Sequence, residues 1–462
     1  MKPLNIEAYN LFHEGILALS DAESHGFCID TKYLNKINVD IDSKIAESKR
    51  LLKEHEVYKV WRKTFGQKTN IASYDQLGKV LFNVLKYPCN NYTKAGKFQA
   101  NEASLLGVDS DFVPLFLNIQ KLSKAKNTYI KGLIRETHDG FLHPMFSLHT
   151  AISFRSSSEK PNFQNIPIRN KDIGELIRKA FISRWPDGQI VEADFKGIEV
   201  SAATCYHKDP KMIAYIKDPS KDMHRDMAMQ IYLLDKKQIT KEIRYCGKNL
   251  FVFPQFYGDW YMNCAKNLWT AIDRMGLKLA DGVGLKKHLK QKDITELGAC
   301  NPDKYSVKGT FEHHLKEVEY DFWHKRFKVY YEWKIKWWEK YLEKGYFDLL
   351  TGFRVSGIYD RKQVINIPIQ GAAFHWMLWC LIKINKKLKK YKMKSLIVGQ
   401  IHDSIISDVC NGELKSYLEI VNETVQKLPK HWDWINVPLV VETEVSPVGK
   451  TWYDKQPYKI GV

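Results

Sequence analysis

The sequence predicts an α+β protein of several domains, in which two segments far apart in the chain contribute strands to one sheet. Helical periodicity dominates residues 6–85 and returns over about 208–344. Short strand-like runs occupy about 140–200 and recur beyond residue 346. Because strands lie on both sides of a long helical segment, and the sequence carries no internal repeat, the two sets are expected to complete a single sheet.

The first elements are predicted to be helices. Apolar residues recur at helical spacing over 6–52 and again over 73–85, and Gly26 and Gly66 interrupt the pattern. The runs FLHPMFSLHTAISF and GQIVEADF then have the composition of strands between turns, so the sheet is expected to begin there.

The second half is predicted to be helical first and mixed afterwards. The aromatic stretch over 320–347 is interpreted as an amphipathic helix that buries its rings in the core, the alternative being a stacking platform. Strands and one helix from Gln370 to about Lys390 follow. Two short buried strands, Leu396–Val398 and Ile405–Ile406, then form a hairpin with a tight turn.

The composition indicates a folded protein with a polyanionic partner. The chain has 462 residues, of which 44% are hydrophobic, enough for two to four domain-sized units. Lys and Arg (71) outnumber Asp and Glu (53), and the resulting net charge of +18 favours nucleic acid as the partner. The alternative is a basic protein without such a partner. Eight cysteines stand singly, without the spacing of a zinc site, which is typical of reduced thiols in the cytosol.

No membrane association is expected. The N-terminus, MKPLNIEAYNLF, lacks the apolar core of a signal peptide and the character of a transit peptide. The most apolar run, GAAFHWMLWCLIKI, contains His375 and is interpreted as too short to span a bilayer. A soluble, cytoplasmic protein is therefore expected, in the host cytoplasm if the source is viral.

Two aspartates stand where buried carboxylates need a counter-charge. Asp403 follows His402 at the mouth of the apolar hairpin, and Asp194 ends an apolar strand before a helix that carries Glu199. If the strands are neighbours, the like charges require cations, and hard oxygen ligands suit magnesium or manganese. The alternative is that both aspartates merely cap turns.

A basic and aromatic helix lies between these aspartates in the sequence. Arg244 and Lys248 are four residues apart and share a helical face, and Phe253 and Tyr257 follow at the same spacing. Cations with an aromatic platform suit a triphosphate and a stacked base. Together with paired carboxylates, they indicate phosphoryl or nucleotidyl transfer.

These segments, in this order, resemble the motifs of family A DNA polymerases. ADFKGIE is similar to D-Y-S-Q-I-E, KDMHRDMA to D-I-H-x-x-T-A, and IHDS to V-H-D-E. The stretch from Arg244 to Gly258 is similar to R-x-x-x-K-x-x-x-F-G-x-x-Y-G. FRSSSEKPNFQNIP and NIPIQGAA resemble two further motifs, G-R-L-S-S-x-x-P-N-L-Q-N-I-P and N-x-P-I-Q-G-T-A, and the likeness extends from about residue 10 to 455.

The resemblance implies a right-hand polymerase fold with an antiparallel palm sheet and largely helical thumb and fingers. The regions expected from it are a thumb-like helical region over 1–125, the first part of the palm with the Asp194 motif over 126–207, fingers over 208–345 with an enlarged insertion near 259–320, and the second part of the palm with the His402–Asp403 hairpin over 346–462.

The resemblance also implies template-directed DNA synthesis that extends a primer 3′-hydroxyl with dNTPs. Two Mg²⁺ ions, for which Mn²⁺ could substitute, would be held by Asp194, Asp403 and the carbonyl of Phe195. The nucleotide contacts carried over are Glu199 as the gate against a 2′-hydroxyl, the triphosphate contacts His224, Arg244 and Lys248, the stacking ring of Phe253, and Tyr257 on the template side. Lys248 would also donate a proton to pyrophosphate. The DNA contacts carried over are Arg155, Asn162, Gln164, Asn165, Asn366, Gln370 and His402.

The sequence departs from the family pattern in a few positions. One extra residue lies between Lys248 and Phe253, and a π-bulge is predicted to absorb it; otherwise Asn249 would take the usual angle of the lysine. Gly197 and Ser201 replace a usual glutamine and arginine, and Ser404 replaces a usual glutamate. Activity is expected to survive, because two aspartates suffice to hold two metal ions.

Two alternative functions remain open. The chain could be a single-subunit RNA polymerase, against which Glu199 argues, or a catalytically impaired DNA-binding protein derived from a polymerase. The resemblance begins near the first residue, so no 3′–5′ exonuclease is expected within the chain and proofreading would need a separate protein.

Overall fold

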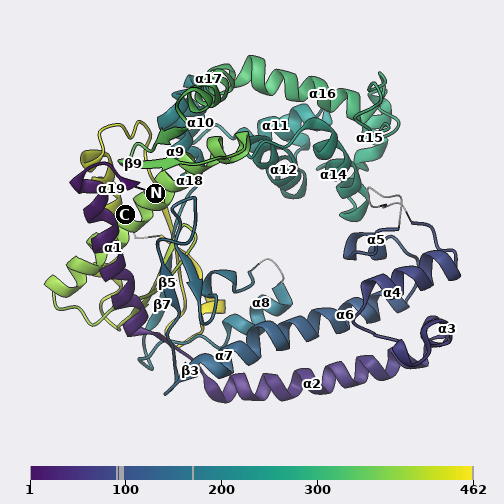
Figure 1. Ribbon diagram of the computed structural model, residues 1–462, viewed down its shortest axis with the longest axis horizontal. Coiled ribbons are helices and arrows are strands. Elements are labelled where there is room, and N and C mark those ends of the chain that lie inside the picture. The colour runs from purple at the N-terminus through teal and green to yellow at the C-terminus, as the bar shows by residue number, and fades with distance from the viewer. Residues whose placement is uncertain (1, 90–91, 93–97, 169–170, 460–462) are drawn as a thin grey trace.

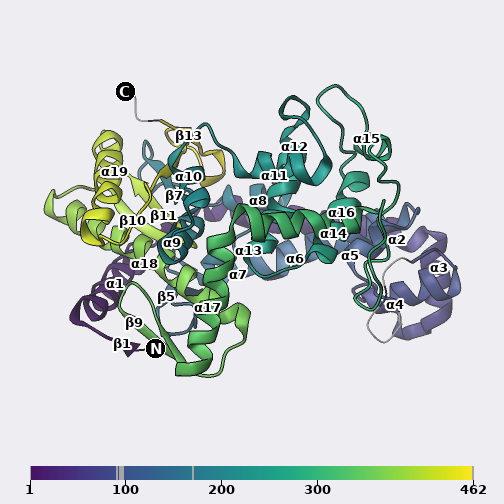
Figure 2. The ribbon, with the colours of Figure 1, turned by 90° about the horizontal axis from the view of Figure 1, so that it is seen from above.

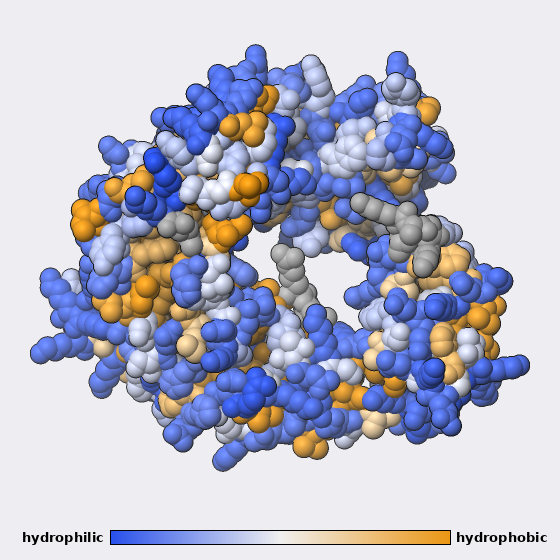
Figure 3. All heavy atoms as spheres, in the orientation of Figure 1, coloured by the Kyte–Doolittle hydropathy of each residue, from blue (hydrophilic) through white to orange (hydrophobic). Residues whose placement is uncertain are grey.

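In the computed structural model, residues 2–89, 92, 98–168 and 171–459 are described. Figure 1 shows the elements arranged as a ring around a central opening, and the opening persists between the atoms in the space-filling view of Figure 3. In the perpendicular view of Figure 2, the largest sheet and helices α1, α18 and α19 lie at one end of the long axis, and α3 and α4 lie at the other.

The main sheet joins two distant parts of the chain, as the strand pattern predicts. Its five antiparallel strands have the order β10-β11-β7-β12-β13. Their bounds are β7 Gln189–Phe195, β10 Leu396–Ile401, β11 Ser404–Val409, β12 Val441–Val445 and β13 Gln456–Tyr458. The central strand β7 therefore pairs with two strands that lie about 200 residues or more further along the chain.

Side chains alternate between two hydrophobic cores across this sheet. Val191 and Ile405 point to the core that contains helix α18, whereas Ile190 and Ile406 point to the core around Trp452. Three small sheets complete the strand set: β1 (Lys2–Pro3) with β9 (Phe353–Ser356) and β8 (Tyr346–Asp348); β2 (Phe27–Cys28) with β4 (Phe141–Leu142) and β3 (Thr137–His138); and β5 (Met145–Ser147) with β6 (Ser157–Glu159).

The helices described form three groups around the sheet. Helix α1 (Ile6–His25) packs against α18 and β10, and α19 (Leu414–His431) also packs against α18. The lower arm of the ring in Figure 1 contains α2 Thr31–Glu54, α3 Glu56–Phe65, α4 Tyr74–Gly78, α5 Glu102–Leu106, α6 Phe112–Lys124, α7 Lys131–Glu136 and α8 Lys171–Arg178. The upper arm contains α9 Ile198–His207, α10 Pro210–Lys217, α11 Met223–Tyr232, α12 Lys241–Gly247, α13 Phe253–Phe256, α14 Tyr261–Arg274, α15 Leu285–Gln291, α16 Phe311–Asp321 and α17 Lys328–Lys344.

The prediction that the long helix before the hairpin begins at Gln370 was wrong, because α18 spans Arg361–Lys390. Asp360 caps its first turn in a capping box with Gln363. Pro368 lies inside the helix and cannot donate to the carbonyl of Val364 four residues earlier. The indole Nε1 of Trp337 donates to that carbonyl at 3.0 Å, so a side chain from α17 satisfies the acceptor and the helix continues.

The apolar run within α18 is also longer than expected. By length and composition α18 could cross a membrane, and the interpretation of the run as too short was wrong. However, 89% of its most apolar window is buried inside the protein. The helix is therefore the central core helix, packed between α1, α9, α17 and α19.

Candidate active site

A pocket of about 410 Å³ opens where β7 and the β10–β11 turn end. The predicted residues that line it are Arg155, Asp194, Phe195, Glu199, Lys248, Phe253, Tyr257, Asn366, His402 and Asp403. The remaining lining includes Gly197, Phe256 and Tyr330. The structure thus brings together the proposed metal ligands, the gate residue and the aromatic helix.

Strand pairing sets the positions of the two aspartates. Asp194 pairs with Ser404, the first residue of β11, so Asp403 lies one step beyond the paired strands. The amide of Phe195 donates to the carbonyl of Asp403 at 3.3 Å and holds the two strand ends together. His402 adopts a left-handed backbone, with φ at 50°, which turns the chain between β10 and β11.

The two carboxylates lack a full counter-charge. Burial, the charge of Asp403 and the nearby Glu192 raise the pKa of Asp194 to about 7. Burial raises the pKa of Asp403 to about 6, although Arg155 opposes the rise. Arg155 Nη2 is 3.9 Å from Asp403 Oδ1, and that oxygen accepts no hydrogen bond from the described residues. An oxygen-ligated divalent cation fits this arrangement, because it would supply the missing positive charge.

Glu199 joins two sides of the pocket. It lies in the first turn of α9, after Gly197, whose left-handed backbone (φ 58°) connects β7 to the helix. Arg155 Nη2 donates to Glu199 Oε1, and the Tyr257 hydroxyl donates to Glu199 Oε2. Burial and the charge of Glu199 raise the pKa of Tyr257. Glu199 is therefore fixed between an arginine and the end of the aromatic helix.

The predicted π-bulge is confirmed. Lys248–Val252 forms one π turn, η6, between α12 and α13. Lys248 keeps its place at the pocket, with Nζ 5.1 Å from the ring centre of Phe253. Asn249 instead turns back, and its Nδ2 donates to the carbonyl of Tyr245 at 3.0 Å. The wider turn absorbs the extra residue, so the alternative in which Asn249 replaces the lysine is wrong.

His224 and Arg244 lie beside the pocket but do not line it. Arg244 Nε donates to Asp222 Oδ2 at 2.6 Å, and Asp222 also caps α11. The ring of His224 meets that of Phe253 edge-on at 5.7 Å. Burial and the charges of Lys248 and Arg244 lower the pKa of His224 to about 4, so the ring is neutral at pH 7. Burial and the charge of Arg244 also lower the pKa of Lys248.

The other predicted DNA contacts surround the hairpin. Gln164 Nε2 donates to Gln400 Oε1 at 2.9 Å and to Ser156 at 2.7 Å, while Asn162 and Asn165 are exposed and outside the pocket. Gln370 lies one helical turn beyond Asn366 on α18. Asn366 lines the pocket with both aspartates, whereas Asn162, Gln164, Asn165 and Gln370 do not line it.

Sequence reasoning missed several residues. Gln400 is fully buried and donates to the carbonyl of His402; a glutamine within an apolar strand was a detectable signal. Tyr330 was assigned to a core helix, and it is buried there, but it also lines the pocket. Glu192 accepts hydrogen bonds from Trp452 Nε1 at 2.8 Å and Lys455 Nζ at 2.6 Å on the same face as Asp194.

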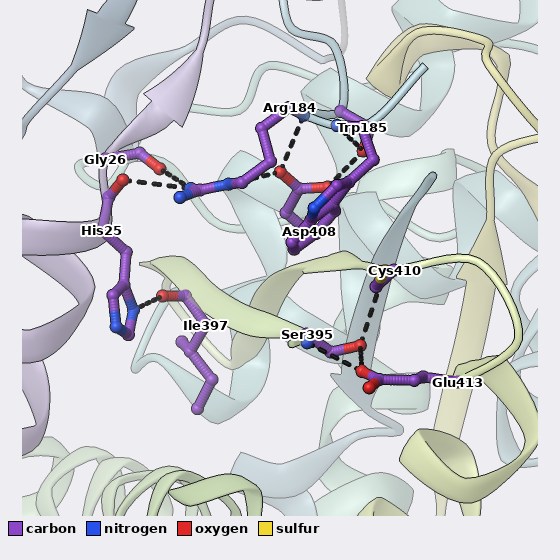
Figure 4. Close-up of polar contacts among 10 residues, drawn as sticks. His25, Gly26, Arg184, Trp185, Ser395, Ile397, Asp408, Cys410 and Glu413 are labelled. Atoms are coloured by element: carbon purple, nitrogen blue, oxygen red, sulfur yellow. Dashed lines mark hydrogen bonds and ion pairs between the residues drawn. The ribbon is translucent and has the colours of Figure 1, made fainter. Parts of the chain in front are cut away.

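The far end of the hairpin contains a second buried carboxylate, which is fully satisfied (Figure 4). Asp408 accepts from Ser183 Oγ at 2.6 Å and from the backbone amide and Nε of Arg184, both at 3.0 Å. Nη2 of Arg184 donates hydrogen bonds to the carbonyls of His25 and Gly26. This network ties the end of α1 to the sheet.

Comparisons with known proteins agree with this arrangement. Residues 33–275 and 353–454 match the family model described as "DNA polymerase family A". DNA polymerase I of Geobacillus stearothermophilus is 26% identical over 446 residues, which cover 95% of this chain and 45% of the relative. The DNA polymerase of Bacillus phage SP01 is 24% identical over 398 residues, which cover 82% of this chain and 40% of the relative. The chain thus spans less than half the length of these curated relatives.

A solved structure shares the fold. The POL domain of Pol1 from M. smegmatis, solved in complex with DNA primer-template and dNTP, superposes with a TM-score of 0.72 at 22% sequence identity. The match covers 96% of this chain and 70% of that one. The predicted α+β polymerase fold is confirmed.

Proposed function

The chain belongs to DNA polymerase family A, and from this premise we propose that it extends a primer 3′-hydroxyl with dNTPs on a DNA template. The observation that carries the proposal is the pairing of Asp194 with Ser404, which brings Asp194 and Asp403 to one end of a pocket that Lys248 and Phe253 also line. Under this proposal, 1–125 acts as the thumb, 126–207 and 346–462 as the palm, and 208–345 as the fingers.

Asp194, Asp403 and the carbonyl of Phe195 would hold two Mg²⁺ ions, or Mn²⁺ in their place. When bound, such ions lower the pKa of the attacking hydroxyl and neutralise triphosphate charge. The raised pKa values of both aspartates support this assignment, because cations would relieve the repulsion that causes part of the shift.

The protein side chains would bind and orient the nucleotide. Arg244 and Lys248 supply positive charge for the triphosphate, and Lys248 donates a proton to the leaving pyrophosphate; its lowered pKa favours such a donor. His224, neutral at pH 7, would donate a hydrogen bond to the triphosphate. Phe253 would stack on the base, and Tyr257 would support the template side.

Glu199 would exclude a ribose 2′-hydroxyl. Its side chain is held from two directions, by Arg155 and Tyr257, and so has little freedom to move away. This fixation supports a preference for dNTPs over NTPs, since a rigid group rejects an additional hydroxyl better than a mobile one. Asn162, Gln164, Asn165, Asn366, Gln370 and His402 would contact primer-template DNA around the pocket.

Primer extension tests the proposal. Wild type, Asp194→Asn, Asp403→Asn and the exposed control Asp433→Asn are compared on a recessed DNA template with Mg²⁺, given dNTPs or NTPs. We expect extension with dNTPs by wild type and Asp433→Asn alone. Equal extension with NTPs would favour an RNA polymerase, and absence of extension in wild type with intact DNA binding would favour a polymerase-derived binding protein.

A further inference from the structure

A buried amide lies directly behind the aromatic helix that faces the pocket. Gln255 is only 1% exposed, whereas Phe253 and Phe256 on the same short helix line the pocket. Both ends of the Gln255 amide are bonded: Trp323 Nε1 donates to Oε1 at 2.7 Å, and Nε2 donates to the carboxylate of Glu319. A buried amide with both ends paired holds its helix in one orientation.

Glu319 also faces the chain on the other side of Tyr257. The backbone of Tyr261 lowers the pKa of the Glu319 carboxyl and so opposes the effect of burial. The turn between Gln255 and Tyr261 contains Tyr257 and Gly258, and Gly258 has a φ of 83°. The Glu319 carboxylate therefore bonds the start of the turn that presents Tyr257 to Glu199.

The partners of this turn come from a different part of the sequence. Glu319 lies on α16 and Trp323 on the π turn η7, within residues 276–352, which the family match does not include. Tyr257 and Glu199 lie within the match. Trp323 is itself held, because Lys334 Nζ lies 3.0 Å from its ring centre and the ring of Phe256 packs against it. Burial raises the pKa of Glu319 to about 6, so breaking its bonds would leave a costly buried group.

We propose that Glu319, acting through Gln255, is a positioning residue that holds Tyr257 against Glu199 and thereby sets the affinity of the pocket for its nucleotide. The inference rests on the proposed function. It assigns a role to a segment that the family motifs leave without one.

A double-mutant cycle with steady-state kinetics tests the proposal. Glu319→Ala is expected to raise KM for dNTP about 10-fold with a smaller change in kcat, since it removes the charge-assisted hydrogen bond to Gln255 that acts through Tyr257. In the Tyr257→Phe background the same substitution should change KM less than about 3-fold. Glu319→Gln, which retains an acceptor oxygen, should restore most of the wild-type KM.

Glu317→Ala is the matched control, because Glu317 lies on the same helix, is 70% exposed, and pairs only with His313 among the described residues. It should leave KM unchanged. The proposal is overturned if Glu319→Ala raises KM equally in both backgrounds, or if it lowers Tm without changing KM. If wild type is inactive, both the proposed function and this inference are contradicted. If wild type is active and the effects of Glu319→Ala and Tyr257→Phe on KM are additive, only the inference is contradicted.

Discussion

The two ends of the β10–β11 hairpin each contain an aspartate, fully buried at Asp408 and partly buried at Asp403, and the two carboxylates have opposite environments. Asp408 is fully buried and accepts hydrogen bonds from Ser183 and Arg184 (Figure 4). Asp403 is 25% exposed at its side chain, and its Oδ1 accepts no hydrogen bond from the described residues. The difference teaches that the first carboxylate is paired within the fold, whereas the second has an oxygen left over for the cation proposed above.

Substituting Asp403 should have the largest effect on activity and little effect on the fold. Asp403→Asn is expected to lower kcat for primer extension by about 1000-fold, because charge compensation at the reacting centre is lost. Tm without divalent cations should be unchanged or higher, since a buried like charge is removed. Kinetics and calorimetry on the same preparation measure both. A lower Tm would show that Asp403 supports the fold, and the comparison would fail.

Substituting Asp408 should have the reverse pattern. Asp408→Ala leaves the Arg184 guanidinium, whose side chain is only 18% exposed, without its carboxylate partner, so the free energy of unfolding should fall by about 3–5 kcal/mol. The molecules that remain folded at low temperature should retain kcat within about 3-fold of wild type. Urea unfolding and active-site titration check the two values. Loss of kcat without loss of stability would contradict the structural role of Asp408.

Divalent cations should stabilise the fold through Asp403 and not through Asp408. At a Mg²⁺ concentration of about 100 times Kd, the free energy of unfolding of wild type should rise by about 2.7 kcal/mol. Asp408→Asn should gain the same amount, and Asp403→Asn should gain much less. Thermal unfolding with Mg²⁺ and with a chelator measures the gain, and an equal gain in both variants would place the cation elsewhere.

His375 tests whether burial without a charge partner is enough to make a residue functional. It is fully buried on α18, Thr351 bonds its Nδ1, and burial lowers its pKa to about 3. Because the folded pKa lies below the ordinary value of 6.5, only the unfolded chain binds a proton as pH falls below 6.5, and stability decreases there. Between pH 6.5 and 5, protonation of His375 in the unfolded chain should lower the free energy of unfolding by about 2 kcal/mol, at about 1.4 kcal/mol per pH unit. The variant His375→Asn should not show this decrease. Its kcat should stay close to wild type, and a large fall would extend the site along α18 from Asn366 to His375.

Ser404 should have the smallest effect. It donates to the carbonyl of Ile401 at 3.0 Å and lies 3.4 Å from Glu192 Oε1. Ser404→Ala should cost about 1 kcal/mol or less and change kcat less than about 3-fold, because it removes one neutral hydrogen bond and no metal ligand. Chemical unfolding and primer extension test both. A larger fall in kcat would place Ser404 in the catalytic machinery.

Local patterns in the sequence were sufficient for the sheet and much of the site. The apolar runs before Asp194 and Asp403 predicted the strands, and the extra residue after Lys248 predicted the π turn, because each depends on neighbouring residues. The family resemblance supplied the order of the motifs. The resemblance gave no structural account of the positions where this chain departs from those motifs.

The features that were missed depend on partners far along the chain. Helix α18 begins nine residues before the predicted start at Gln370 and continues through Pro368. The carbonyl of Val364, which Pro368 cannot bond, accepts from Trp337, and no local pattern reveals that contact. Gln400 and Gln255 are polar residues in apolar surroundings, and their partners Ser156 and Glu319 lie 244 and 64 residues away. A buried glutamine can be suspected from sequence, but its bonding partner is set by tertiary packing.

The position of β7 has a consequence for synthesis of the chain. Its two neighbours, β11 and β12, are translated long after it, so both edges of the central strand stay open until β11 emerges at residues 404–409, and one edge stays open until β12 emerges at 441–445. An open apolar strand invites intermolecular pairing. Glu192 and Asp194 interrupt that strand with negative charge, and like charges on neighbouring nascent chains repel. The carboxylates of β7 therefore protect the unfinished polypeptide from aggregation before any pocket exists.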